Sequence, residues 1–197
     1  MSPSTTKPRG RPREFDVDEA VQQSVEVFWR NGFSGTTTRT LEQHLGISQS
    51  SLYHAFQSKE GLFEEVLVCY EAKLHQTVLS TLERDDPDRD TIIEFLDAVT
   101  RWIRNDRHRG CLVLNLAADA GQEAIDGSRR LRAYRKTLRR LLEPAVASFT
   151  SDPADTDARV EMLVAAILGL NISATSGASK AELSGMRNAI VHQVRAW

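Results

Sequence analysis

The chain has 197 residues, of which 41% are hydrophobic and 26% are charged. This composition is that of a soluble globular protein and excludes a disordered, fibrous or membrane-embedded chain. The net charge of −2 argues against a generic polyanion-binding domain, which is usually basic. Basic charge is nevertheless concentrated at one end, because the first 13 residues contain Lys7, Arg9, Arg11 and Arg13 and no acidic residue.

The N-terminal segment predicts an arm followed by a helix. Residues 1–14 are rich in Pro, Ser, Thr and Arg and have no apolar periodicity, so we expect a flexible basic arm. Asp16 with Glu19 three residues later is typical of a helix N-cap. Apolar residues then recur at helical spacing as far as Gly32, which should end the helix.

Two short helices should follow. Thr36, Thr37 and Thr38 are candidate N-caps for the first, which Gly46 would end. Ser48 can cap the second, and the spacing of Leu52 and Phe56 turns them both inward. Further helices are expected at about 58–74, 92–103, 112–120, 131–142, 157–173 and 183–197, with loops at 84–90, 151–155 and 176–179. The prediction is an all-α chain of about nine helices.

Two short helices joined by a glycine-containing turn form the helix-turn-helix pattern, in which the second helix enters the DNA major groove. On that helix Gln49 can pair with adenine, and Ser50 can bond several base edges. Hydroxyl, imidazole and ammonium groups, together with helix N-termini, suit phosphates. The candidate phosphate contacts are Thr37, Thr38, Ser48, Tyr53, His54 and Lys59.

Three arginines extend the predicted DNA contacts, and each has a simpler alternative. Arg39 could contact a phosphate or a base, or it could be a solvated surface charge. Arg11 and Arg13 could enter the minor groove as part of a flexible arm, or belong to a solubilising tail. Tyr53 could instead be a partly buried packing residue.

Three segments carry a resemblance to a known family. They are Asn31-Gly-Phe-Ser-Gly-Thr-Thr-Thr-Arg-Thr-Leu, Leu45-Gly-Ile-Ser and Ser51-Leu-Tyr-His-Ala-Phe-Gln-Ser-Lys-Glu-Gly-Leu-Phe. Across residues 15–70 the chain resembles TetR/AcrR-type transcriptional regulators. The resemblance implies a homodimer of nine-helix subunits, with DNA bound by the first three helices and dimerisation through the last two. Gln49 stands where that family often has Lys, and Glu42 stands where it often has Ala. These differences affect which operator sequence is recognised and not the mode of DNA binding.

The resulting prediction is a ligand-responsive repressor with a helix-turn-helix domain at 15–60 and a domain at 61–197 for effector binding and dimerisation. Two recognition helices would lie in successive major grooves of a pseudo-palindromic, double-stranded operator. An unidentified small-molecule effector would enter an apolar cavity and release the DNA. The candidate cavity residues are Phe95, Trp102, Cys111, Leu116, Tyr134, Leu138 and Met162, and the simpler alternative for each is core packing.

Cys111 supports a second hypothesis, a redox- or electrophile-sensing repressor. It follows Gly110 at an expected helix start, near Arg107 and Arg109, and both surroundings lower the pKa of a thiol. The Gly-Cys-Leu segment resembles one in some regulators of the same family, one of which senses electrophiles through a reactive cysteine there. The alternative is a small buried residue, the commonest state of a free cysteine. Cys69 should be a packing residue.

The remaining features narrow the function further. Seven basic residues between 129 and 140 could bind an anionic partner or simply form a solvated helix face. We find no His-Glu-x-x-His, Gly-rich phosphate loop or Gly-x-Ser-x-Gly motif, so no enzyme, metal or cofactor is expected. Two cysteines, a polar N-terminus and no apolar run near 20 residues predict a cytoplasmic protein without a membrane partner. A non-DNA helical binding module is the remaining alternative.

Overall fold

The computed structural model describes residues 15–104, 110–118 and 126–197, and these residues form helices and loops without a strand. The all-α prediction is therefore confirmed for this part of the chain. The helices are α1 (Val17–Gly35), α2 (Thr38–Leu45), α3 (Gln49–Phe56), α4 (Lys59–Thr77), the 3₁₀ turn η1 (Leu79–Leu82), α5 (Arg89–Ile103), α6 (Leu112–Ala118), α7 (Gly127–Ala147), α8 (Pro153–Thr175) and α9 (Lys180–Ala196).

Local sequence signals account for most of the helix ends. The Asp16 carboxylate accepts hydrogen bonds from the backbone N–H groups of Asp18 and Glu19, at 2.9 and 3.1 Å, which caps α1 as expected. Gly32 has φ 70°, a left-handed conformation that interrupts the helix where its end was expected. One further turn then carries the chain to Gly35, which the sequence pattern did not predict.

The start of α8 differs from the prediction. Residues 151–155 were expected to be a loop, but α8 begins at Pro153. Asp152 caps the helix by accepting a hydrogen bond from the Ala154 N–H at 2.9 Å. Proline suits the first helical position because a backbone N–H there would have no acceptor within the helix, so its absence costs no hydrogen bond. The turn η1, formed by Leu79–Leu82, was also not predicted.

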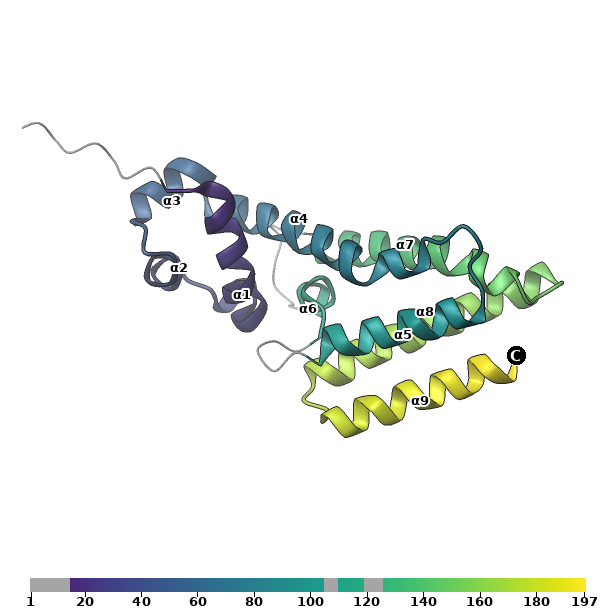
Figure 1. Ribbon diagram of the computed structural model, residues 1–197. Coiled ribbons are helices and arrows are strands. Elements are labelled where there is room, and N and C mark those ends of the chain that lie inside the picture. The colour runs from purple at the N-terminus through teal and green to yellow at the C-terminus, as the bar shows by residue number, and fades with distance from the viewer. Residues whose placement is uncertain (1–14, 105–109, 119–125) are drawn as a thin grey trace, which may run out of the picture.

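The first three helices gather at one end of the molecule, around the beginning of α4 (Figure 1). Their shared core contains Phe28, Leu41, Leu52 and Leu62, all fully buried. α1 packs against α4, so the small N-terminal group of helices rests on the long helix that leads away from it. Any displacement of α4 therefore acts directly on α1.

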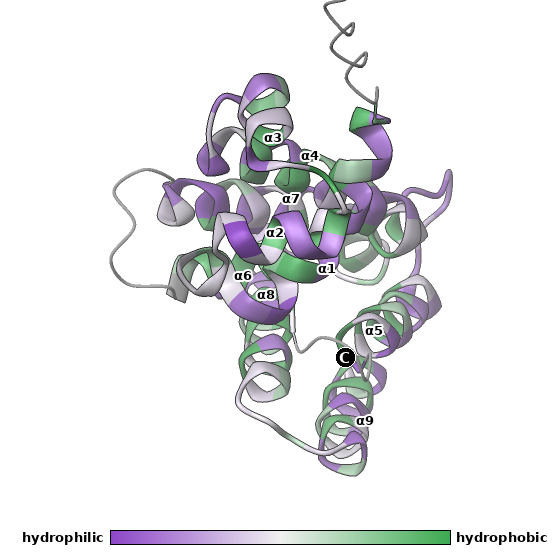
Figure 2. Ribbon diagram, turned by 90° about the vertical axis from the view of Figure 1, so that its left-hand side faces the viewer, coloured by the Kyte–Doolittle hydropathy of each residue, from purple (hydrophilic) through white to green (hydrophobic). Residues whose placement is uncertain are grey.

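Beyond α4 the remaining helices form a bundle. α7 packs against α6 and α8, and α9 packs against α5 and α8. Hydrophobic and hydrophilic residues alternate around α5 and α9, the pattern of helices with one apolar face (Figure 2). This bundle places α4 and α7 on either side of the pocket described below.

α8 is long and apolar enough to cross a membrane by length and composition, with a mean hydropathy of 1.4 over its most apolar 18 residues. Its position gives a simpler reason for this composition. Leu163, Val164, Ile167 and Leu170 are fully buried against the neighbouring helices. The side of α8 that faces the other helices of the bundle therefore needs apolar residues.

Candidate functional site

The turn between α2 and α3 is defined by three local interactions. The Thr37 hydroxyl accepts from the Thr40 N–H at 3.1 Å and caps α2. Gly46 ends that helix in the left-handed conformation, with φ 66°. The Ser48 hydroxyl then accepts from the Ser51 N–H at 3.2 Å and caps α3. The Gly46 end of α2 and the Ser48 cap of α3 agree with the sequence prediction, because each rests on a contact within three or four residues.

α3 has two chemically different faces. Leu52 and Phe56 are buried against the other helices, as their spacing predicts. The opposite face is polar and open to solvent. Its exposed residues are Gln49, Ser50, Tyr53 and His54, and Arg39 is exposed on the neighbouring α2. A short helix with one anchored face and one hydrogen-bonding face has the geometry that major-groove reading requires.

Glu42 has a role that the sequence analysis missed. Its carboxylate accepts a hydrogen bond from the Gln49 N–H, at the first residue of α3. The Gln49 side chain in turn donates to the Thr38 hydroxyl at 3.5 Å. Glu42 therefore joins α2 to the N-terminus of α3, and it occupies one of the N–H groups that we expected to attract a phosphate at Ser48.

The hydroxyls of Thr37 and Ser48 are engaged within their own helices. The Thr37 hydroxyl lies 2.9 Å from that of Thr40, and the Ser48 hydroxyl lies 2.9 Å from those of Ser50 and Ser51. These two hydroxyls therefore stabilise the N-termini of α2 and α3. Thr38 is half-buried beside them.

The Lys59 ammonium forms hydrogen bonds within the protein. Its Nζ donates to the carbonyl oxygens of Phe33 and Thr36, at 3.1 and 2.9 Å, and lies 4.0 Å from the centre of the Phe33 ring. The ammonium satisfies carbonyl groups at the end of α1, where a positive charge is favourable. Lys59 thus ties the first residue of α4 to α1.

Replacing Lys59 by Met should lower the free energy of unfolding by about 1–3 kcal/mol, because two partly buried carbonyls lose a charged donor. Urea denaturation followed by circular dichroism measures the change. Lys73→Met is the matched control, since Lys73 is exposed on the same helix. Equal stability of the two variants would contradict a structural role for Lys59.

Arg11 and Arg13 lie outside the described residues, as do Arg107 and Arg109. The expectations that the arm enters a minor groove and that these cations flank Cys111 therefore remain predictions.

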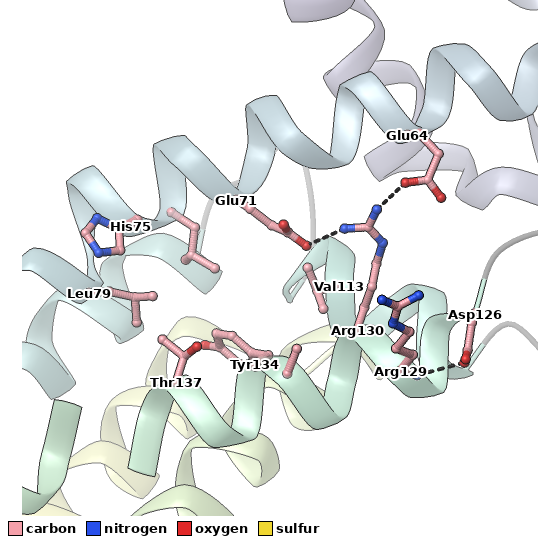
Figure 3. Close-up of a pocket in the computed structure, with 12 residues that line it drawn as sticks. Glu64, Glu71, His75, Leu79, Val113, Asp126, Arg129, Arg130, Tyr134 and Thr137 are labelled. Atoms are coloured by element: carbon pink, nitrogen blue, oxygen red, sulfur yellow. Dashed lines mark hydrogen bonds and ion pairs between the residues drawn. The ribbon is translucent and has the colours of Figure 1, made fainter. Parts of the chain in front are cut away.

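A pocket of about 510 Å³ lies between α4 and α7 (Figure 3). Its volume is within the range of small-molecule sites, roughly 300–1,000 Å³. The residues that line it are Glu64, Glu71, Leu74, His75, Leu79, Val113, Asp126, Arg129, Arg130, Ala133, Tyr134 and Thr137. Of the predicted cavity residues, this pocket contains Tyr134.

The other predicted cavity residues lie elsewhere. Phe95 and Leu138 are fully buried and Leu116 is 5% exposed, so these three pack in the core and do not line the α4–α7 pocket. Trp102 lines a separate groove beside α1 and α4. Met162 is on the outside of α8, with 36% of its surface exposed. Helical periodicity identifies a buried face, but it does not tell packed residues from residues beside a void.

Cys111 belongs to a buried hydrogen-bond network and does not line the α4–α7 pocket. The Tyr70 hydroxyl donates to its Sγ at 3.2 Å and accepts from Trp102 Nε1 at 3.0 Å and from the Leu112 N–H at 3.2 Å. Burial raises the pKa of the Cys111 thiol, against the lowering effect of the Tyr70 hydrogen bond. The expected lowering of this pKa is therefore wrong, because desolvation outweighs the helix N-terminus.

Cys111 should consequently react slowly with iodoacetamide, because the thiolate is the nucleophile and little of it forms. In the folded protein at about pH 8, we expect Cys69→Ser, which retains Cys111, to be alkylated roughly tenfold more slowly than Cys111→Ser, which retains the half-buried Cys69. Mass spectrometry at timed intervals measures both rates. Faster alkylation of Cys111 would support the sensor hypothesis instead.

Three of the seven basic residues of α7 form ion pairs with neighbouring helices. Arg130 bridges Glu64 and Glu71 of α4, and Arg139 bridges Asp157 and Glu161 of α8. Arg135 pairs with Glu161 at 3.4 Å. This pattern favours the reading of the stripe as a helix face over that of a surface for an anionic macromolecule.

Comparison with known proteins identifies the chain. Residues 21–66, which contain the α2–turn–α3 unit, match the family described as bacterial regulatory proteins, tetR family. The HTH-type transcriptional repressor ComR of Escherichia coli K12 is 31% identical over 186 residues, covering 90% of this chain and 88% of ComR. The chain belongs to the tetR family. It is a transcriptional regulator rather than an enzyme, and the resemblance seen in the sequence is confirmed.

Solved structures of tetR-family regulators extend the match well beyond residues 21–66. A cysteine mutant of CifR, determined with 26-bp double-strand operator DNA, is 30% identical, with a TM-score of 0.79 over 95% of this chain and 100% of that one. The reduced form of Escherichia coli NemR is 20% identical, with a TM-score of 0.70 over 88% of this chain and 94% of that one, and shares the fold.

Proposed function

We propose that this tetR-family protein is a homodimeric repressor that binds a pseudo-palindromic operator through α3 and releases it when a small molecule enters the α4–α7 pocket. The observation that carries the proposal is α3 itself, whose Leu52 and Phe56 are anchored in the core while Gln49 and Tyr53 face solvent. CifR, of the same fold, has been solved on operator DNA. The protein would act in the cytoplasm, where the operator is.

Within this proposal Gln49 and Ser50 read base edges, while Tyr53, His54 and Arg39 contact phosphates. Thr37, Thr38 and Ser48 chiefly hold the two helices in place, and Lys59 supports them from α4. Arg11 and Arg13 would contact the minor groove beside the site.

Replacing Gln49 by Ala tests the base contact. A bidentate pair with adenine discriminates by about 1–3 kcal/mol, so operator affinity should fall roughly 5- to 150-fold. The operator is obtained by selection from a random duplex library, and fluorescence anisotropy measures binding. Gln76→Ala is the control, because Gln76 is exposed on α4 away from α3. A failure of the wild type to select any duplex would support the non-DNA binding module.

The homodimer is supported by exposed apolar side chains on α8 and by one glycine on each of α8 and α9. Met162 and Ile172 of α8 are 36% and 61% exposed. A Cβ added at Gly169 of α8 or Gly185 of α9 would meet nothing within 4 Å, so packing within one subunit does not require either glycine. Glycine destabilises a helix by about 1 kcal/mol relative to alanine. Close approach of a second helix, which a larger side chain would prevent, explains why glycine stands at these positions.

The release mechanism rests on how α4 is placed. This helix borders the pocket through Glu64, Glu71 and Leu74, and its first residue, Lys59, is bonded to the end of α1. An effector that favours another position of α4 would shift α1 and, with it, α3. By linkage, operator DNA must weaken effector binding by the same factor.

A further inference from the structure

The first residue of α3 is held by two residues of the preceding helix. The backbone N–H of Gln49 donates to the carboxylate of Glu42, and its side-chain Nε2 donates to the Thr38 hydroxyl at 3.5 Å. Thr38 and Glu42 stand four residues apart on α2, so they lie on the same face of that helix. Both the backbone and the side chain of Gln49 are therefore attached to α2.

The position of Gln49 explains why this attachment matters. Gln49 begins α3, its side chain is exposed, and helix ends fray because their residues make fewer intrahelical bonds. A glutamine reads an adenine through two hydrogen bonds formed at once, one from the amide nitrogen and one to the amide oxygen. Such a contact requires the side chain to be held to within about 0.5 Å, which a frayed helix end does not provide by itself.

The Glu42 carboxylate is well suited to hold this residue. It lies at the N-terminus of α3, where the helix dipole favours a negative charge, and its bond to the Gln49 N–H is charge-assisted. Glu42 is half-buried, whereas the next two residues of α2, Gln43 and His44, are exposed. The Glu42 carboxylate is thus engaged with α3 and is not a solvated surface charge.

The bond from Gln49 to Thr38 leaves the amide able to read a base. A carboxamide has two N–H groups and one carbonyl oxygen. With one N–H on the Thr38 hydroxyl, the second N–H and the oxygen can still pair with N7 and N6 of an adenine. The side chain is then ordered before DNA binds, so less conformational entropy is lost on binding.

We propose that Glu42 is a specificity-determining residue of the DNA interface, which positions Gln49 to read one base pair of the operator. Glu42 acts through Gln49 and contacts no base itself. This inference rests on the proposed function, in which Gln49 reads a base edge, and it adds the residue that makes this contact selective.

The test compares the selected operator with duplexes in which one base pair at a time is replaced, by fluorescence anisotropy on the full-length protein. Gln49→Ala first identifies the base pair that Gln49 reads, as the position where discrimination falls. At that base pair Glu42→Ala should lower discrimination by roughly fivefold or more, because the reading side chain loses its support. Discrimination is a ratio of two affinities, so any change in the folded fraction cancels from it.

Two further variants separate positioning from general stabilisation. Glu42→Gln retains a side-chain oxygen that accepts from the Gln49 N–H, so it should restore discrimination at that base pair. In the Gln49→Ala background, Glu42→Ala should cause no further loss there, because the residue to be positioned is gone. Glu143→Ala is the control, since it removes an exposed carboxylate from α7 and should leave discrimination unchanged.

Four results would overturn the inference. In Glu42→Ala they are an equal loss of affinity for every duplex, unchanged discrimination at the base pair that Gln49 reads, and a loss of discrimination at another base pair. The first would make Glu42 a structural residue only, and the third would show that its carboxylate contacts DNA directly, as with a cytosine N4 group. The fourth is a Gln49→Ala variant that loses discrimination nowhere, because Glu42 would then have no base reader to position.

The same measurements separate this inference from the proposed function. A wild type that selects an operator but gives one of these four results refutes only the role of Glu42. A wild type that selects no duplex refutes the repressor itself.

Discussion

For the proposed homodimer, replacing Gly185 by Arg is expected to leave the protein folded but monomeric, and to lower operator affinity by roughly 100-fold or more. Gly185 lies within α9, and a Cβ added there would meet no atom within 4 Å apart from the neighbouring backbone of its own helix. The substitution also replaces the residue with one of the weakest helix propensities by a good helix former. Any loss of function must then come from contacts outside the subunit.

The size of the effect follows from how a dimer holds a two-part operator. When one recognition helix binds its half-site, the second binds as an intramolecular partner at high effective concentration, which increases overall affinity by about 10²–10⁴. An arginine at a close helix–helix contact adds bulk and an unpaired, desolvated charge on each side of the dimer. The monomer then binds with one α3 alone.

Analytical ultracentrifugation gives the oligomeric state, and anisotropy with the selected duplex gives the affinity. Gly185→Ala is the control, because it adds only a methyl group and should keep the protein dimeric. Ala165→Arg, at an exposed position of α8, should reproduce the effect of Gly185→Arg. If Gly185→Arg remains a dimer with full operator affinity, the interface lies on another surface.

Replacing Phe63 by Ala should lower the free energy of unfolding by about 3–5 kcal/mol. Phe63 of α4 is 1% exposed, and its ring centre lies 4.6 Å from that of Phe28 and 5.0 Å from that of Phe33, both on α1. The substitution removes the ring at the centre of this aromatic contact and leaves a cavity between α1 and α4. Because native proteins are stable by only about 5–15 kcal/mol, much of that stability would be lost.

Urea denaturation measures the loss for Phe63→Ala, and operator binding at rising temperature should fail earlier than in the wild type. Val68→Ala is a matched control on the same helix, because Val68 is 58% exposed and surface substitutions usually change stability by about 0.5 kcal/mol or less. Similar stability of the two variants would show that the contact between α1 and α4 contributes little.

The sequence by itself determined the all-α class, the α2–turn–α3 unit and the faces of α3. Each of these depends on interactions within a few residues. Ser48 caps α3 through Ser51, Gly46 ends α2 by its own conformation, and Leu52 and Phe56 lie one helical turn apart. The helix-turn-helix could therefore be located before any tertiary contact was known.

Only the tertiary structure decided which groups from distant segments form hydrogen bonds, bury one another or line a common pocket. Lys59 bonds to carbonyls 23 and 26 residues earlier in the chain. Glu42 reaches the start of the next helix, and Tyr70 meets Cys111 across 41 residues, in a site where burial raises the thiol pKa. The pocket needs α4, α6 and α7 together, so Arg129 and Arg130 appear in the sequence only as part of a basic stripe. Periodicity specifies which side of a helix is buried, whereas the partner that it meets there, and any space left between them, depends on the packing of the whole chain.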